Sequence, residues 1–545
     1  MRIFLLLIIL LPSLSFSQTA PDKYWVQFTD KPSQFSLEAP QEFLSQRAID
    51  RRIRQGIAFD ADDLPVHQSY VDQVSQLGDV QVLHRSKWFN AITIKITDPL
   101  LLEEISNLPF VAQTRSVKCY TIPEVEFDRI EDERRFTEYD TSVYGESLRQ
   151  IEMVNGHLLH AADFTGEGLQ IAVMDAGFRR SRELPIFDYL RAEGKITEQN
   201  DLVEWWDTDV NGHSNHGTWV LSIMGGYMPD SLIGTAPDAH YFLFRTEDSD
   251  SEFIIEEDNW VAAIEEADSL GIDLVNTSLG YSEYDDPTLD HDYSNMDGRT
   301  ARISIASTIA ARKGMLLVTS AGNKGLSSWK YITAPADADS ILTVGAVDAT
   351  GTHAGFSSFG PSFDGRVKPN VVTMGESTVI ADLDSTIRRG NGTSFSAPVL
   401  CGLAACLWQA HPSKTNMEVL KAIEQSAHLF SNPNDSLGFG IPDFWKAHLI
   451  LRGDAEENTD QITLYPNPSK GPMRLELKLN AALNEAPEFD IFGNDGKLVA
   501  QGCLNYFGDR ILHSFDYAHL NAGSYVLRVR TPEQNFTKRF VISDR

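Results

Sequence analysis

Between about residues 145 and 450, short apolar segments alternate with helical patterns, and this alternation constrains the fold most. Continuous apolar runs of this length are typical of strands buried on both faces of a sheet. Alternating strands and helices predict an α/β domain with a parallel sheet and helices on both faces. Ligand sites in such sheets lie at the carboxyl ends of the strands. The strand candidates are LQIAVMD, YFLFRT, DLVNTSL, MLLVTSAGN and ILTVGAVD, and the clearest helices are DNWVAAIEEADSLG and ARISIASTIAARKG.

A smaller unit precedes this domain, and another follows it. Residues 19–120 show the order strand, helix, strand, strand, helix, strand, which predicts a ferredoxin-like α+β fold. Its first helix is the basic amphipathic segment FLSQRAIDRRIRQG, which a glycine ends. The charged, weakly periodic residues 121–144 are interpreted as a linker, and residues 145–450 as the α/β domain. Short alternating runs in residues 456–545 predict an all-β sandwich.

The N-terminus has the pattern of a secretory signal peptide. Arg2 precedes the apolar run Ile3–Leu11, and small polar residues follow. We therefore expect residues 1–17 to be a signal peptide. The run is too short to span a bilayer, and no later stretch of 18 uncharged apolar residues predicts a transmembrane anchor.

Charge and cysteine content narrow the functional classes. The 545-residue chain has a net charge of −31, so its surface repels phosphate backbones and we expect no nucleic-acid partner. The four cysteines form no disulfide framework and have no metal-site spacing. Cys401 and Cys406 lie five residues apart on a predicted helix, where they point in different directions, so we interpret them as buried apolar groups.

Two polar residues have positions suited to a catalytic cleft. Asp175 ends an apolar strand and is followed by Ala176 and the permissive Gly177. His216 begins a predicted helix in SNHGTWVLSIMGG. Taken alone, each has an ordinary alternative: Asp175 as a turn or helix-capping residue, and His216 as a helix-start histidine. The neighbouring His213 is interpreted as a solvated loop residue.

A third segment, NGTSFSAPVLCGLAACLWQAHP, predicts a helix that Ser394 opens. We place Pro398 in or near the first turn, where a missing N–H costs little. The arrangement directs a hydroxyl and helix-start N–H groups at one point, which suits a nucleophile beside a developing oxyanion. The alternative is that Ser394 is only a helix cap.

The motifs DAG, HGT and GTSFSAP, in the order Asp, His, Ser, resemble those of subtilisin-like serine peptidases. The resemblance covers about 300 residues. It implies a subtilisin-like fold, with Asp175 as orienter, His216 as general base and acid, and Ser394 as nucleophile. The chain has HGTWVL and GTSFSA where many relatives have HGTHVA and GTSMA, so its substrate preference stays open.

Secondary motifs agree with this resemblance. In TSAGNKG, Asn323 matches the family's oxyanion asparagine, and Gly322 precedes it. Ser278, Leu279 and Gly280 in VNTSLG resemble the strand that pairs with substrate and lines the S1 pocket. The segment GTAPDA also matches. The resemblance therefore implies a secreted endopeptidase that hydrolyses peptide bonds through an acyl-enzyme on Ser394.

We expect no cofactor for the chemistry. Structural calcium is common in the family, and acidic loops such as YSEYDDPTLDHDY (281–293) are candidates. The alternative is a solvated negative loop, so we predict no specific metal ligands.

The flanking units suggest partners and localisation. The N-terminal unit resembles the family's inhibitory propeptides, with an additional structural domain as the alternative. LYPNPSKG, LNAGSYVLRV and TKRFVIS resemble the sorting domain of type IX secretion cargo, with a substrate-binding sandwich as the alternative. We therefore expect the chain's own propeptide, the type IX secretion machinery and protein or peptide substrates as partners.

Two N-glycosylation patterns bear on the source. Asn276-Thr277-Ser278 and Asn391-Gly392-Thr393 overlap the catalytic motifs, where a glycan would block the cleft. We therefore expect a bacterial protein that is exported through the periplasm and becomes secreted or surface-bound. Two competing hypotheses are an adhesion protein that keeps the fold without turnover and a structural surface protein.

Overall fold

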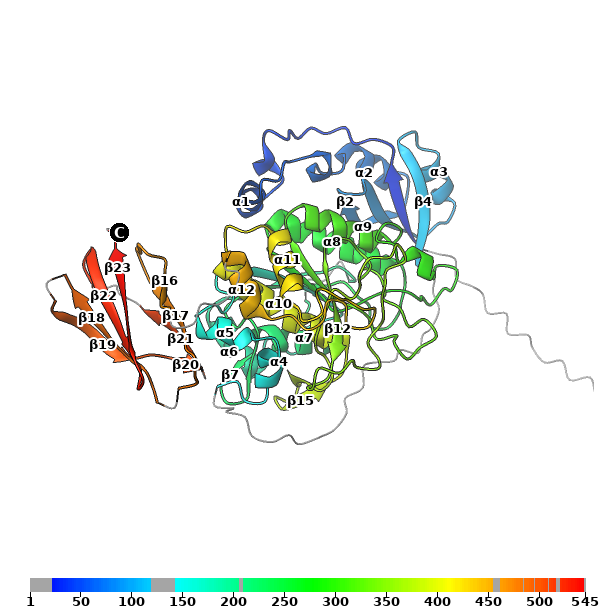
Figure 1. Ribbon diagram of the computed structural model, residues 1–545. Coiled ribbons are helices and arrows are strands. Elements are labelled where there is room, and N and C mark those ends of the chain that lie inside the picture. Colours follow the sequence, from blue (N-terminus) through cyan, green and yellow to red (C-terminus); the bar gives the residue numbers. More distant parts are fainter. Residues whose placement is uncertain are drawn as a thin grey trace, which may run out of the picture.

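The computed structural model describes residues 22–118, 143–204, 209–453, 461–483, 485–494, 496–507, 509–515 and 520–543. It consists of three units that follow one another along the chain (Figure 1). The N-terminal unit lies over two helices of the large central domain, and the C-terminal β-sandwich lies at another side of that domain. The predicted signal peptide and almost all of the predicted linker lie outside the described residues.

The central domain is built on a seven-stranded sheet of order β13-β12-β11-β10-β5-β9-β6. All neighbouring strands of this sheet are parallel, which confirms the predicted architecture. The strands are β5 (Gln170–Asp175), β6 (Ile196–Asp201), β9 (His240–Arg245), β10 (Leu274–Thr277), β11 (Leu316–Ser320), β12 (Leu342–Val347) and β13 (Val371–Met374). Five of these strands were predicted from the sequence, and the edge strands β6 and β13 were not.

Helices cover both faces of this sheet. On β5, Ile171 and Val173 pack into one core, while Ala172 and Met174 pack into the core under α8 and α9, because successive side chains of a strand point to opposite faces. The helices are α4 (Leu148–Glu152), α5 (Gly156–Ala161), α6 (Asp188–Ala192), α7 (His216–Gly225), α8 (Ile255–Leu270), α9 (Arg302–Arg312), α10 (Thr393–Ala410), α11 (Asn416–Ser426) and α12 (Phe444–Arg452). Small hairpins are formed by β7 (Tyr227–Met228) with β8 (Leu232–Ile233) and by β14 (Thr378–Ala381) with β15 (Ile387–Gly390).

Helix α10 runs through the centre of this domain. By length and composition it is the one described helix that could cross a membrane, but 89% of it is buried inside the protein. Its Cys401 and Cys406 are both buried and unbridged. The helix is therefore a core element of the central domain.

The N-terminal unit has one antiparallel sheet of order β2-β3-β1-β4. Its elements are β1 (Lys23–Phe28), α1 (Gln46–Gln55), α2 (Gln68–Ser75), β2 (Val80–Ser86), β3 (Ala91–Ile96), α3 (Leu101–Ser106) and β4 (Val111–Lys118). Helices α2 and α3 pack with this sheet, through Val71 and Val74 of α2 and Ile105 of α3. The prediction from sequence included α3 but wrongly gave the place of α2 to the basic helix α1.

Helix α1 instead docks on α8 of the central domain. Arg51 and Arg52 are buried, and their Nη2 atoms lie 2.5 and 2.7 Å from Oδ1 of Asp268 on α8. Nζ of Lys87 lies 3.2 Å from the other oxygen of this carboxylate. The basic character of α1 is therefore used to bind an acid of the next domain, which is why its charge pattern does not fit a sheet-covering helix.

The C-terminal unit is the predicted sandwich, made of two four-stranded antiparallel sheets of order β16-β17-β21-β20 and β19-β18-β22-β23. The strands are β16 (Thr463–Tyr465), β17 (Met473–Lys478), β18 (Glu488–Gly493), β19 (Leu498–Cys503), β20 (Tyr506–Phe507), β21 (Arg510–Phe515), β22 (Gly523–Arg530) and β23 (Asn535–Ile542). Glu476 of β17 pairs with Arg452 of α12, and Arg474 donates to the carbonyl of Ala162 at 2.7 Å. The sandwich is thus docked on the central domain.

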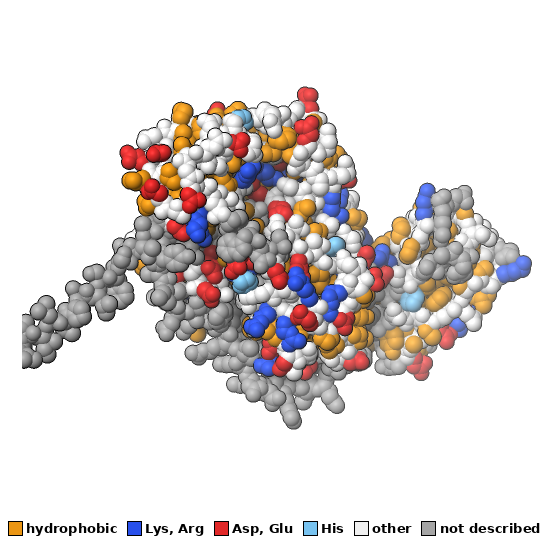
Figure 2. Space-filling view, turned by 180° about the vertical axis from the view of Figure 1, so that it is seen from behind, with side chains coloured by type: hydrophobic (Ala, Val, Ile, Leu, Met, Phe, Trp, Pro, Cys, Tyr) orange, Lys and Arg blue, Asp and Glu red, His pale blue; other side chains and the backbone are white. Residues whose placement is uncertain are grey.

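The rear of the molecule has a mixed charge. Figure 2 shows Lys and Arg side chains gathered in the lower middle of that view, with acidic side chains among them. The excess of acid in the composition is therefore interrupted by basic groups on this face.

Candidate active site

Asp175 and His216 lie together at the carboxyl end of the parallel sheet. Asp175 is the last residue of β5 and is fully buried, and His216 is the first residue of α7. Nδ1 of His216 lies 2.8 Å from Oδ1 and 3.0 Å from Oδ2 of Asp175. Oδ1 also accepts the backbone N–H of Ala176 at 2.8 Å. The carboxylate is therefore placed to hold the imidazole in one orientation.

Two glycines of the motifs allow this approach. The N–H of Gly217 donates to the carbonyl of Gly177 at 3.1 Å, and a Cβ on Gly217 would lie 2.5 Å from that oxygen. Gly177 has a φ of 146°, and a Cβ there would lie 2.8 Å from the backbone of Gly212 and Ser214. The strand end and the helix start therefore pack backbone against backbone, which sets the distance between the side chains of Asp175 and His216.

Ser394 reaches the same region through the packing of α7 on α10. Its helix begins at Thr393, and Ser394 is 6% exposed. The ring of Phe395, the next residue, lies nearly parallel to that of His216, with centroids 6.0 Å apart. Phe395 also packs in one cluster with Ile223 of α7. Three motifs far apart in the chain are thus joined by one helix pair and one strand end.

Pro398 is the sixth residue of α10, just past the first turn and close to its predicted place. It cannot donate the N–H that would bond to the carbonyl of Ser394 four residues earlier. The hydroxyl of Ser278 donates to this carbonyl instead, at 2.9 Å. The proline therefore leaves the carbonyl of Ser394 as an acceptor for Ser278, the first residue of the expected substrate-binding segment.

Asn323 lies beside the start of α10. Its Oδ1 accepts the N–H of Thr393 at 2.8 Å and the hydroxyl of Thr393 at 2.9 Å. The oxygen of that hydroxyl in turn accepts the N–H of Gly322 at 3.1 Å. Because Oδ1 is held in this way, the amide orientation is determined and its other end is a donor NH₂ group. The contact of Thr393 with Asn323 was not predicted from the sequence. The hydroxyl residue directly before Ser394 could have indicated it.

The expected substrate-binding residues lie at the end of β10. Gly280 and Gly322 approach the same side chain: a Cβ on Gly280 would lie 2.3 Å from Oγ1 of Thr333, and one on Gly322 would lie 3.0 Å from it. Leu279 is 6% exposed. The two glycines follow different strands, β10 and β11, and both lie close against Thr333. A side chain at either position would crowd Thr333.

The segment GTAPDA links α7 and α10. The hydroxyl of Thr235 lies 3.3 Å from the carbonyl of Pro398 on α10 and 3.4 Å from that of Ile223 on α7. A Cβ on Gly402 would lie 2.0 Å from this hydroxyl. The match to this family segment therefore has a structural basis in the α7–α10 contact.

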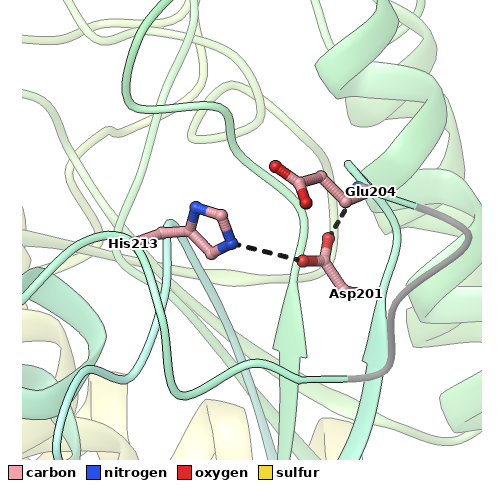
Figure 3. Close-up of side chains that lie close together, drawn as sticks. All are labelled: Asp201, Glu204 and His213. Carbon is pink, nitrogen blue, oxygen red and sulfur yellow. Dashed lines mark hydrogen bonds and ion pairs between the residues drawn. The ribbon is translucent and has the colours of Figure 1, made fainter.

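His213 lies 3.9 Å from a carboxylate oxygen of Asp201, and Figure 3 shows its ring turned toward Asp201 with Glu204 nearby. Ligand atoms of the three residues lie within 4.8 Å of one another, the spacing of a possible metal site. However, Nη1 of Arg245 lies 2.8 Å from Asp201 and 3.9 Å from Glu204. This guanidinium already pairs with both carboxylates, so the group does not by itself indicate a bound metal ion.

The loop predicted as a calcium candidate, residues 281–293, uses its acids in other ways. Asp290 accepts the N–H of Tyr284 at 2.7 Å, and Asp286 accepts from Thr288 at 2.7 Å. Glu283 lies 3.0 Å from Lys324. Among the described residues, two groups have three acidic or histidine side chains close enough to hold one metal ion, and both lie outside this loop. They are Asp201, Glu204 and His213, and Glu247, Glu252 and Glu256.

Family models match all three units. Residues 166–440, about half of the chain, match the model of the subtilase family. Residues 23–132 match that of the peptidase S8 propeptide domain of Bacteroidota, and residues 463–543 match a secretion system C-terminal sorting domain. The two flanking matches fall on the N-terminal α+β unit and the C-terminal sandwich.

Curated relatives are similar over the central domain. Subtilisin NAT of Bacillus subtilis subsp. natto is 27% identical over 306 residues, which are 56% of this chain and 71% of that protein. Subtilisin BL of Lederbergia lenta is 26% identical, over 52% of this chain and 92% of that protein. The thermophilic serine proteinase of Bacillus sp. (strain AK1) is 30% identical, over 52% and 63%.

Two solved structures are similar at a lower level. The MycP3 protease from the type VII (ESX-3) secretion system has a TM-score of 0.43 and 22% identity, over 57% of this chain and 89% of that one. The prenylagaramide maturation protease PagA has a TM-score of 0.43 and 23% identity, over 55% and 99%. At this level the two structures say nothing about the substrate of this chain.

Proposed function

The chain belongs to the subtilase family and is a serine endopeptidase with a propeptide and a secretion sorting domain, and we propose the following roles for its site residues. Ser394 is the nucleophile, His216 is the general base and acid, and Asp175 orients the imidazole. The observation that carries this proposal is the 2.8 Å contact of His216 with Asp175 beside the start of the Ser394 helix.

In the first step, His216 takes the proton of the Ser394 hydroxyl while Oγ attacks the carbonyl carbon of the scissile peptide. With Nδ1 held by Asp175, Nε2 is the nitrogen that accepts this proton. The resulting imidazolium is stabilised by the buried carboxylate and then protonates the leaving amine. A water molecule, activated by His216 in the same way, hydrolyses the acyl-enzyme and restores Ser394.

The negative oxygen of each tetrahedral intermediate needs hydrogen-bond donors. The amide NH₂ of Asn323 and the backbone N–H of Ser394 are the proposed donors. Thr393 supports this assignment, because it holds the other end of the Asn323 amide through two hydrogen bonds. The positive end of the α10 dipole adds to the stabilisation. This mechanism uses only groups of this chain and needs no cofactor.

Substrate binding is proposed at Ser278, Leu279 and Gly280, with Gly322 opposite. An extended peptide would add its backbone to the segment after β10, as peptides do at exposed strand edges. The hydrogen bond of Ser278 to the carbonyl of Ser394 supports this placement, because it ties the segment to the nucleophile.

Hydrolysis itself has a direct test. After removal of its N-terminal unit, the protein should cleave casein, a serine-directed fluorophosphonate should block this cleavage, and Ser394→Ala should abolish both casein cleavage and labelling. Casein binding without hydrolysis by the processed protein would favour the adhesion hypothesis and contradict the proposal.

The N-terminal unit is proposed to inhibit the peptidase until the chain cleaves itself between about residues 118 and 145. The docking of α1 on α8 supports this, because it holds the unit on the peptidase domain. N-terminal sequencing of the wild type and Ser394→Ala tests the proposal. Identical processing of both proteins would rule out self-cleavage.

The sorting domain marks a secreted or cell-surface protein. We propose that it passes the periplasm and is recognised there by type IX secretion machinery. Deleting residues after about 455 should trap the protein in the periplasm, whereas normal export of the truncated chain would contradict the route.

A further inference from the structure

One buried side chain occupies the space between the two glycines of the expected substrate-binding segments. A Cβ on Gly280 would lie 2.3 Å from Oγ1 and 3.3 Å from Cβ of Thr333. A Cβ on Gly322 would lie 3.0 Å from the same Oγ1 and 3.4 Å from Cγ2. Gly280 is exposed and Gly322 is half-buried, whereas Thr333 is 1% exposed. The Cβ directions of both glycines therefore converge on Thr333, which forms the end of the space between them.

The backbone around Thr333 is held in this place. Tyr281 and Ala334 exchange two backbone hydrogen bonds, of 2.8 and 3.0 Å, which tie the threonine to the segment of Gly280. The N–H of Ala336 donates to the carbonyl of Thr333 at 2.8 Å. A β-branched side chain also has few favourable χ1 rotamers, and a rotation would only exchange the methyl group for the hydroxyl. Thr333 therefore cannot easily leave the space that it fills.

The proposed oxyanion donors determine which substrate residue meets this space. The oxygen that Asn323 and the N–H of Ser394 are proposed to bind is the carbonyl oxygen of the residue before the scissile bond. The side chain of that residue branches from the carbon next to this carbonyl. Gly322 directly precedes Asn323. Ser278, two residues before Gly280, donates to the carbonyl of Ser394 at 2.9 Å. Both glycines are therefore within reach of this one substrate side chain.

We propose that Thr333 limits the residue before the scissile bond to a small side chain, that of Ala or Ser, an assignment that rests on the function proposed above. Both γ atoms of Thr333 lie against the glycines, where a longer substrate side chain would have to enter. Closely packed atoms give way only at a cost in free energy, and here the segment is tied on both sides. Leu and Phe should therefore be poor at this position.

The alternative is that Gly280 and Gly322 only make room for Thr333, while the substrate side chain lies elsewhere. The two interpretations differ in one measurable respect. If Thr333 closes the substrate space, removal of its γ atoms should admit larger side chains. If the contact only packs the protein, the same change should lower stability and leave the substrate preference as it was.

The test uses the protein after removal of its N-terminal unit and tetrapeptide p-nitroanilides that differ only in the residue before the scissile bond. Labelling with a fluorophosphonate first gives the concentration of active Ser394. We expect kcat/KM to be at least about 100-fold higher for Ala than for Phe, because a single excess methylene in a closed pocket costs about 10- to 200-fold. Thr333→Ala should reduce this ratio at least about tenfold, by raising kcat/KM for Phe.

Thr319→Ala is the matched control. Thr319 is also fully buried, and within the described part of the chain its hydroxyl, like that of Thr333, has no hydrogen-bond partner. Neither Gly280 nor Gly322 has Thr319 among its nearest neighbours. Thr319→Ala should therefore keep the ratio of Ala to Phe. Thr333→Val should keep it as well, because valine has the shape of threonine without its hydroxyl.

Preferential cleavage after Phe or Leu by the wild type would overturn the proposal, and this measurement needs no variant to fold. An equal ratio of Ala to Phe in the wild type and a folded Thr333→Ala would also overturn it, because the glycines would then only accommodate the threonine. These outcomes leave the peptidase assignment intact. Absence of both labelling and hydrolysis would instead reject the proposed function, and the restriction at Thr333 with it.

Discussion

Oδ1 of Asn323 accepts both the backbone N–H and the hydroxyl of Thr393, at 2.8 and 2.9 Å. The amide that is proposed to bind the oxyanion is therefore oriented by the residue directly before the nucleophile. Any change in this contact should alter the rate of the chemical step more than the binding of substrate.

Asn323→Ala should lower kcat by about 100- to 1,000-fold, the loss known for the corresponding change in subtilisin, with little change in KM. Asn323→Asp is the matched control, because it keeps Oδ1 as an acceptor for Thr393 but replaces the donor NH₂ with a carboxylate. We expect Asn323→Asp to lose at least as much activity. Near-normal kcat in either variant would contradict the oxyanion role.

Asp175→Asn should lower kcat by about 10⁴-fold, because the amide cannot hold the imidazole in the required tautomer. The side chains have nearly the same shape, so the fold and substrate binding should be unchanged. Steady-state kinetics on a peptide substrate, together with circular dichroism, checks this. A loss of less than tenfold would show that Asp175 does not orient His216.

The contact between α1 and α8 should depend on Asp268. Although burial alone would raise its pKa, Lys87, Arg51 and Arg52 hold the pKa of this carboxyl well below 3.8. Asp268→Asn leaves two buried guanidinium groups without their shared anion, so it should cost about 3–5 kcal/mol in stability. Denaturant unfolding of the Ser394→Ala chain measures the loss.

The control for this prediction is Asp62→Asn. Asp62 lies 3.9 Å from Arg312, and both side chains are exposed at 39% and 65%. Such a pair contributes about 0–1 kcal/mol. Equal losses in the two variants would mean that the buried arginines do not anchor the N-terminal unit through Asp268.

His291 and Glu257 form a buried pair at 2.8 Å that should make stability depend on pH. Burial alone would lower the pKa of His291, but the hydrogen bond and charge of Glu257 raise it above 6.5. His291 also faces Asp337, Arg302 and the hydroxyl of Tyr284. The pKa of Glu257 is lowered to about 2, since His291 outweighs the effect of burial.

The raised pKa of His291 gives stability that is complete below pH 6.5 and is lost as pH rises through the folded value. The lowered pKa of Glu257 gives stability that is complete above pH 4.5 and is lost toward pH 2. His291→Gln should therefore cost most between pH 4.5 and 6.5, about 3–5 kcal/mol, and much less at pH 9. An equal cost at both pH values, by denaturant unfolding, would contradict this.

Much of the architecture was predictable from local patterns. The buried strands of the central sheet are continuous apolar runs, and the start of α7 at His216 and the end of α1 at Gly56 follow standard helix signals. The candidate catalytic residues were found because each lies in a short motif with glycines. Gly177 and Gly217 have a structural reason there, since the two backbones touch.

Other features could not be predicted because the residues that explain them lie far away in the sequence. The basic amphipathic helix α1 was assigned to the ferredoxin-like fold of the N-terminal unit, but its arginines are buried against Asp268, more than 200 residues away. Pro398 lies near the helix start as predicted, but the sequence did not indicate that Ser278 takes up the carbonyl that the proline leaves unbonded. Neither partner can be inferred from residues nearby in the chain.

The sequence alone determined the periodicity of each element and the chemical types at the candidate site, because both depend on neighbouring residues and on backbone conformation. The tertiary structure decided which charges meet: Arg245 with Asp201, but no described hydrogen-bond partner for Oε2 of Glu256. Whether a buried carboxylate is neutralised depends on side chains from other elements within a few ångströms. That proximity exists only after the chain has folded.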